Sequence, residues 1–179
     1  LDPVSKLAAA RTLTPATASS SLGEALGLGA VDDDELYAAL DWLLARQDRV
    51  QKKLAVRHLR EGGLVLYDLS SSYFEGTTCP LAKLGHNRDG KSGLLQVNYG
   101  LLTDARGCPV AVSVHEGNVA DSQTLMPEVT RLREDFGIEQ LVMVGDRGMI
   151  SNQAIAAMRE ADGIGWITAL KSASIRALI

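Results

Sequence analysis

Two short runs of apolar residues, far apart in the chain, each carry an aspartate. Residues 63–69 read Gly-Leu-Val-Leu-Tyr-Asp-Leu, with Asp68 inside the run. In residues 140–146, Leu-Val-Met-Val is followed by a glycine and then by Asp146. Apolar side chains on both faces of a short run predict a strand that is buried on both sides of a sheet. We therefore expect two buried strands that each deliver a carboxylate.

The residues between and after these runs predict a hairpin and a series of alternating helices and strands. Residues 94–102 and 108–115 alternate in polarity and flank a turn at 104–107, the pattern of a β-hairpin. Three elements follow: a helix from Asp121 or Ser122 to about Phe136, a helix over 152–161 capped by Ser151, and a strand over 164–170. This order predicts an α/β fold in which helices flank a mixed sheet.

The N-terminal part predicts helices and a linker. A short helix is expected around residues 4–11, followed by a linker rich in Thr, Ser, Pro and Ala. Acidic residues open a stripe of leucines over 32–59, which predicts one long amphipathic helix or two helices broken near Gln47. Its apolar side can pack on the next domain or pair two copies of the chain. We place the boundary between an N-terminal helical segment, 1–61, and an α/β domain, 62–179.

Composition narrows the functional classes. A chain of 179 residues with a net charge of -4 is not a strongly basic DNA-binding module, although an enzyme with local DNA contacts stays open. Cys79 and Cys108 lack the spacing of zinc ligands, so we expect reduced thiols in a cytoplasmic protein. No apolar run approaches bilayer length, so no membrane partner is expected.

The two aspartates predict a metal site. A buried, unpaired carboxylate is costly, so Asp68 needs a cation, a hydrogen-bond network or water. If the two strands pair in parallel, Asp68 and Asp146 become neighbours, and paired carboxylates suit Mg²⁺ or Mn²⁺. The alternative for Asp146 is a turn cap, because Arg147 and a glycine follow it. Asp68 is harder to explain in that way.

Several blocks resemble bacterial insertion-sequence transposases of the DDE type. Residues 67–76, YDLSSSYFEG, resemble the first catalytic block of that family, and residues 144–149, VGDRGM, resemble the second. Residues 98–104, 109–112 and 116–118 resemble the blocks between them, in the same order. The resemblance implies a ribonuclease H-like fold and Mg²⁺-dependent cleavage and strand transfer at the ends of an insertion sequence. It makes Asp68 the first metal ligand and Asp146 the second.

The resemblance also implies a third acid, a glutamate on a later helix, that the sequence does not reach before Ile179. Glu160 and Asp162 follow Asp146 too closely to take that role. We therefore expect a catalytic domain truncated at its C-terminus, and inactive alone. Two alternatives stay open: a transposase remnant that folds without doing chemistry, and another nuclease of the ribonuclease H-like class.

The expected partners are double-stranded DNA and, in a full-length parent, a second copy of the chain. The loop over 77–93 carries Lys83, Arg88 and Lys91, which we expect to contact the DNA backbone. A solvated surface loop is the alternative. Arg147 can bridge to a phosphate or pair with a nearby acid. These assignments predict a cytoplasmic protein associated with the nucleoid.

Overall fold

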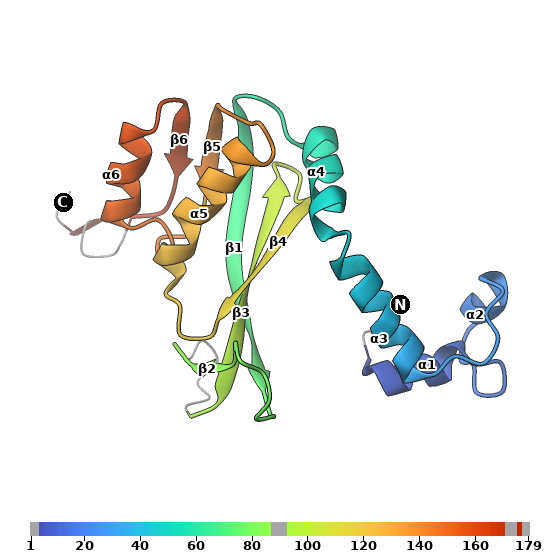
Figure 1. Cartoon of the computed structure of the whole chain (residues 1–179). Helices are drawn as coiled ribbons and strands as arrows, with labels where there is room; N and C mark the ends of the chain where they lie inside the picture. The colour runs from blue at the N-terminus through green and yellow to red at the C-terminus, as the bar shows by residue number, and fades with distance from the viewer. Residues whose placement is uncertain (1–3, 87–92, 171–174, 177–179) are drawn as a thin grey trace. The chain divides into compact units, whose positions relative to one another are not determined.

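The computed structural model describes residues 4–86, 93–170 and 175–176. The chain forms two compact units, Leu1–Val50 and Gln51–Ile179, so the division at residues 61 and 62 stays a prediction. The first unit contains the helices α1 (Lys6–Leu13), α2 (Leu22–Ala25) and α3 (Asp33–Leu44), and α4 (Gln47–His58) runs across the boundary between the units (Figure 1). No helix in the described ranges is long and apolar enough to span a bilayer.

Hydrogen bonds at the two ends of α3 explain where this helix begins and ends. The carboxylate of Asp32 accepts from the backbone N–H of Glu35 at 2.8 Å, and the Glu35 side chain accepts from Asp32 N–H at 3.2 Å. At the other end, the Arg46 guanidinium donates to the Trp42 carbonyl at 3.0 Å and lies 4.0 Å from the Trp42 ring centroid. The amphipathic segment is therefore two helices, which confirms the alternative with a break near Gln47.

A six-stranded mixed sheet forms the second unit, with β1 at its centre. β1 pairs antiparallel with β3 and parallel with β5; β6 continues the parallel side, and β2 and β4 both pair with β3. This arrangement confirms the predicted ribonuclease H-like mixed sheet with flanking helices. The strands are β1 (Gly63–Phe74), β2 (Lys83–Leu84), β3 (Leu95–Asp104), β4 (Pro109–Glu116), β5 (Leu141–Val144) and β6 (Ile164–Ile167).

Two helices, α5 (Asp121–Glu134) and α6 (Asn152–Glu160), complete the core of this unit (Figure 1). The N-cap of α5 is Ala120, one residue before the predicted cap, whereas the Ser151 hydroxyl caps α6 as predicted, accepting from Ala154 N–H at 3.2 Å. Alternate residues of β1 are buried with apolar residues of both helices: Val65, Tyr67, Leu69, Leu125, Val129, Leu132, Ala154 and Met158.

A glycine in the neighbouring strand makes room for the largest of these side chains. A Cβ atom at Gly100 would collide with the hydroxyl and ring of Tyr67. The Tyr67 ring therefore fills the space that any larger residue at position 100 would need. Burial raises the pKa of the Tyr67 hydroxyl above its ordinary value.

The opposite face of the sheet is open, which corrects the expectation that β1 is buried on both sides. Leu64 is 42% exposed, and Val112 and Val114 of β4 are 41% and 54% exposed. Apolar residues on both faces of a strand do not by themselves show what covers each face. In the described part of the chain, this face carries exposed apolar side chains with Asp68 among them.

A matched pair of substitutions on β4 tests this difference between the two faces. Val110 is 1% exposed and Val114 is 54% exposed. Val110→Thr buries a hydroxyl and is expected to lower the free energy of unfolding by about 1–3 kcal/mol. Val114→Thr is expected to change it by less than about 0.5 kcal/mol. Urea unfolding of both variants measures the effects, and equal losses would show that the Val114 face is covered in solution.

Candidate functional site

The pairing of β1 with β5 brings the two aspartates to equivalent sequence positions beyond the same parallel ladder. The last recorded pair of this parallel ladder is Leu66 with Val144. Asp68 and Asp146 each follow two residues later, Asp68 within β1 and Asp146 just after β5 ends. The structure thus gives the parallel, adjacent strands that the proposed metal site requires, at the carboxyl end of β5.

Asp68 lies on the open face of the sheet and is exposed. Its Oδ1 accepts a hydrogen bond from the backbone N–H of Leu69 at 2.9 Å. The expected burial of Asp68 is therefore wrong, and of the three alternatives given for its charge, a cation, a hydrogen-bond network or water, solvation by water is open to this exposed carboxylate. What the structure offers instead is an accessible acid on the central strand.

Asp146 forms the turn that leads from β5 toward α6. Its Oδ1 accepts from the backbone N–H groups of Gly148 at 2.9 Å and Met149 at 2.8 Å. The alternative role of Asp146 as a turn cap is thus present in the structure. Both recorded bonds use the same oxygen, and Asp146 is exposed, so its Oδ2 is available to a ligand. Capping of the turn and binding of a metal are compatible at this residue.

A tyrosine that the sequence analysis did not single out borders Asp68. Tyr99 pairs with Ser70 across β1 and β3, two residues along β1 from Asp68 and on the same face. The Ser72 hydroxyl donates to the Tyr99 hydroxyl at 3.4 Å, and hydrogen bonds from Ser70 and Ser72 lower the pKa of Tyr99. The run of serines after Asp68 was the available signal, because a serine hydroxyl on a strand face can hydrogen-bond to a tyrosine on the neighbouring strand.

The predicted DNA contacts are only partly brought to the aspartates. Arg147 is exposed and follows Asp146 directly. Lys83 lies in β2, opposite Gln96, rather than in an open loop. Arg88 and Lys91 lie outside the described residues.

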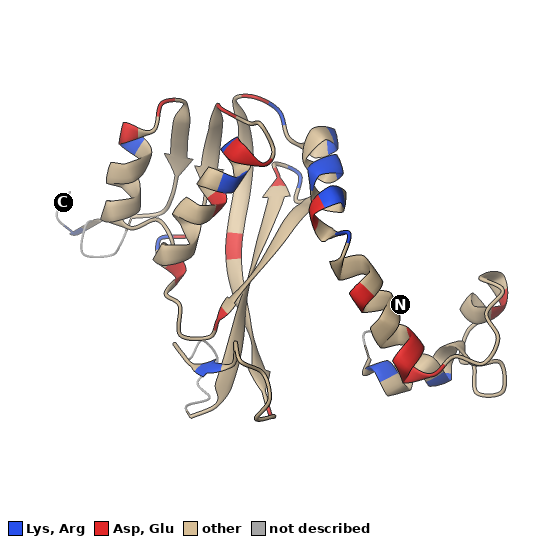
Figure 2. Cartoon of the chain, in the orientation of Figure 1, with Lys and Arg blue, Asp and Glu red and all other residues tan. Residues whose placement is uncertain are grey.

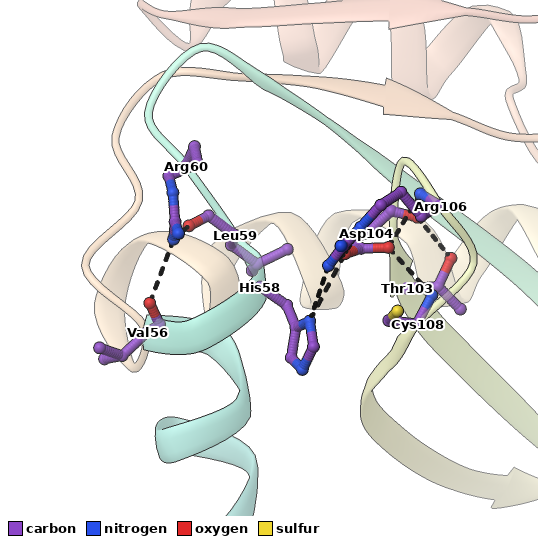
Figure 3. A network of polar contacts seen from close by, with 8 residues as sticks. All are labelled: Val56, His58, Leu59, Arg60, Thr103, Asp104, Arg106 and Cys108. Carbon is purple, nitrogen blue, oxygen red and sulfur yellow. Dashed lines mark hydrogen bonds and ion pairs between the residues drawn. The ribbon is translucent and has the colours of Figure 1, made fainter.

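A second group of potential metal ligands lies at the turn between β3 and β4. His58, Asp104 and Cys108 each offer one ligand atom, and these atoms lie within 4.8 Å of one another, the only such group of three in the described ranges. His58 comes from the end of α4, so the group joins that helix to the turn (Figure 3). The sequence analysis set Cys108 aside on spacing alone and did not foresee the group.

The contacts of Asp104 favour a structural role for this group. Its Oδ1 accepts from the backbone N–H groups of Arg106 at 2.8 Å and Cys108 at 2.9 Å. Its Oδ2 accepts from Arg106 Nη2 at 2.9 Å and lies 3.5 Å from His58 Nδ1. The bond from Cys108 N–H, followed by those from Arg106, lowers the pKa of Asp104 to about 2. The Arg106 guanidinium already neutralises this carboxylate. We therefore interpret His58, Asp104, Arg106 and Cys108 as a structural polar cluster that ties α4 to the hairpin turn, and call it the lock.

Comparison with known proteins identifies the family. A family model described as the transposase DDE domain matches residues 65–176, more than half of the chain. The chain belongs to the DDE transposase family. The match contains the six-stranded sheet from Val65 onward, together with Asp68 and Asp146.

The DDE domain also has distant likenesses among solved structures. A piggyBac transposase synaptic complex with hairpin DNA is 13% identical over 63% of this chain and 24% of that chain, with a TM-score of 0.45. A Mos1 transposase paired-end complex is 11% identical over 99% of this chain and 62% of that chain, with a TM-score of 0.39. The DDE chain therefore spans less than two thirds of these proteins. No curated protein matches it, and the family assignment rests on the match over residues 65–176.

The lock at Asp104 gives this DDE domain a testable pH dependence. A depressed pKa in the folded state means that ionised Asp104 stabilises the fold above its unfolded pKa of 3.8, and that this contribution is lost as the pH falls toward about 2. Asp104→Asn should lower the melting temperature at pH 7. The difference in melting temperature between this variant and the unsubstituted chain should shrink below pH 3.8.

Melting curves followed by circular dichroism from pH 7 downward measure this difference. Asp162→Asn, at an exposed position, is the matched control and should leave the melting temperature unchanged at every pH. If the melting temperatures of Asp104→Asn and the unsubstituted chain differ by the same amount over the whole acid range, the role of the Asp104 charge is contradicted.

Proposed function

We propose that Asp68 and Asp146 are the first two metal ligands of a DDE transposase active site. We further propose that the parent protein cleaves DNA and transfers strands at the ends of a bacterial insertion sequence. The observation that carries the proposal is the register of β1 and β5, because each aspartate follows the last recorded pair, Leu66 with Val144, by two residues. The match to the DDE family supports the class of reaction.

The two aspartates fit a hard divalent cation. The recorded hydrogen bonds of each side chain engage Oδ1, so each exposed carboxylate has an oxygen to offer. Mg²⁺ and Mn²⁺ take oxygen ligands and keep several waters, which an open site allows. Such ions activate a water or a 3′ hydroxyl and neutralise charge on the leaving oxygen. The protein's part is to hold Asp68 on the central strand and Asp146 in its hydrogen-bonded turn.

We propose that a third acid completes the site from a segment that covers the open face. Among the described residues, no third His, Cys, Asp or Glu joins Asp68 and Asp146 in a group of ligand atoms. The exposed apolar side chains around Asp68 offer a surface on which such a segment can pack. Without the third acid, this chain binds metal and performs no strand transfer, as in the alternative of an inactive remnant.

Double-stranded DNA and a second copy of the parent are the proposed macromolecular partners. Arg147 is exposed beside Asp146, where a guanidinium can contact a phosphate near the reacting bond. Lys83 is half-buried on β2, and we propose that it contacts the DNA backbone away from the aspartates. Arg88 and Lys91 complete the predicted set outside the described residues.

Binding of Mn²⁺ tests the metal site without requiring activity. At a concentration of Mn²⁺ 100 times the dissociation constant, a ligand that binds only the folded state stabilises it by about 2.7 kcal/mol. Mn²⁺ should therefore raise the melting temperature of the unsubstituted chain. Asp68→Asn and Asp146→Asn should each remove most of this rise, whereas Asp162→Asn should retain it. An equal rise in all four proteins would place the bound Mn²⁺ elsewhere.

Nicking of plasmid DNA separates an active nuclease from an incomplete one. The chain alone should leave supercoiled plasmid intact in Mg²⁺ or Mn²⁺, because two carboxylates hold a metal without completing a two-metal site. Agarose gels measure the nicked fraction. Metal-dependent nicking that disappears in Asp68→Asn would contradict the incomplete site and favour a nuclease that works with two aspartates.

A further inference from the structure

A basic surface on α4 stands out against the acidic balance of the chain. Residues 52–60 contain four Lys and Arg residues and no Asp or Glu, whereas the whole chain has a net charge of -4. Figure 2 shows Lys and Arg gathered along this helix. We call Lys52, Lys53 and Arg57 of α4, together with Arg60 just after its end, the α4 basic stripe. Such a local concentration of charge attracts a polyanion even on an acidic protein.

Lys53 and Arg57 lie opposite the side of α4 that packs on the rest of the unit, whereas Lys52 lies at the flank of that side, about 60° from Ala55. Gln51 and Ala55 are 5% and 1% exposed. Lys53 and Arg57 each follow one of these residues by two positions, about 200° around the helix. Val56, between them, is 77% exposed, which confirms that this side of α4 faces solvent. The charges of Lys53 and Arg57 are therefore directed away from the packed side of α4.

The nearest acids along the chain to the stripe are Asp48, one turn before Lys52 in α4, and Glu61. No ion pair recorded in the described ranges involves any of its four residues. Glu61, the next acid along the chain, accepts instead from the backbone N–H groups of Glu139 at 3.1 Å and Gln140 at 2.8 Å. Arg60 donates to the Val56 carbonyl in the last turn of α4 at 3.3 Å, so it also caps the helix end (Figure 3). Lys52, Lys53 and Arg57 are the cations of the stripe that remain available to a partner.

The helix that carries the stripe is fixed at both ends of its packed side. Gln51 Nε2 donates to the Val112 carbonyl at 3.3 Å, and the Gln51 side-chain oxygen accepts from Arg131 of α5. At the other end, His58 lies against Asp104 in the lock described above. A fixed helix loses little conformational entropy when its charged side binds a partner.

We propose that the α4 basic stripe binds the phosphate backbone of duplex DNA independently of sequence and of metal. This inference rests on the proposed function for the choice of DNA as the polyanion. From Lys52 to Arg57 the helix rises about 7.5 Å, enough to meet about two successive phosphates of one strand. The stripe is separate from Arg147 and Lys83, so it adds a second contact that holds DNA while the aspartates act.

The salt dependence of binding to a fluorescent duplex of arbitrary sequence, in EDTA, tests the stripe. Lys53→Gln/Arg57→Gln should reduce the slope of log K against log salt by about 2, since each lost phosphate contact removes about 0.9. Arg11→Gln/Arg159→Gln removes the same charge from exposed positions elsewhere and should leave the slope unchanged. Glutamine keeps the helix propensity of α4, so both variants are expected to fold. Circular dichroism checks this.

Three results would overturn the proposal: an unchanged slope in the α4 variant, an equal loss in the control variant, or binding of the stripe to anionic lipid vesicles but not to DNA. The outcome is independent of the metal site, because EDTA removes divalent ions from the assay. If Asp68→Asn loses the Mn²⁺ effect and Lys53→Gln/Arg57→Gln keeps the salt slope of the unsubstituted chain, the metal site is retained and the stripe is rejected. If Asp68→Asn keeps the Mn²⁺ effect and the slope of Lys53→Gln/Arg57→Gln falls, only the stripe is retained.

Discussion

The double pairing of β1 is the constraint on which the second unit depends. One edge of this strand is hydrogen-bonded antiparallel to β3 over ten residue pairs, and the other is parallel to β5 over four. The antiparallel side is reached through the segment that contains β2, whereas the parallel side requires the crossover through α5. That crossover brings Asp146, far along the chain, beside the strand that carries Asp68. Without it, the two carboxylates would belong to separate surfaces.

The same sheet divides the molecule into a packed face and an accessible one. Tyr67 and Leu69 are buried under α5 and α6, while Asp68 between them points to the open face. Alternation along a strand thus serves both purposes, because neighbouring residues go to opposite faces. The packed face fixes the strand, and the open face leaves Asp68 accessible.

The sequence predicted the elements with strong local patterns. The hairpin around Asp104, the Ser151 cap and the two aspartate strands have signals within a few residues, and all are present in the structure. The prediction that Asp68 is buried was wrong, because whether a sheet face is covered depends on elements distant in the chain. The two-residue strand β2 is too short to show a period. The lock between His58 and Asp104 joins side chains from separate elements, so their spacing in the chain carried no signal.

Gly100 has a consequence for the candidate site that its own chemistry does not suggest. Because position 100 has no side chain, the hydroxyl and ring of Tyr67 occupy the space beside β3 where a Cβ atom would stand. Asp68 follows Tyr67 on β1 and points to the opposite face of the sheet. The position of the backbone that carries this candidate ligand therefore depends on packing against Gly100 on the far face.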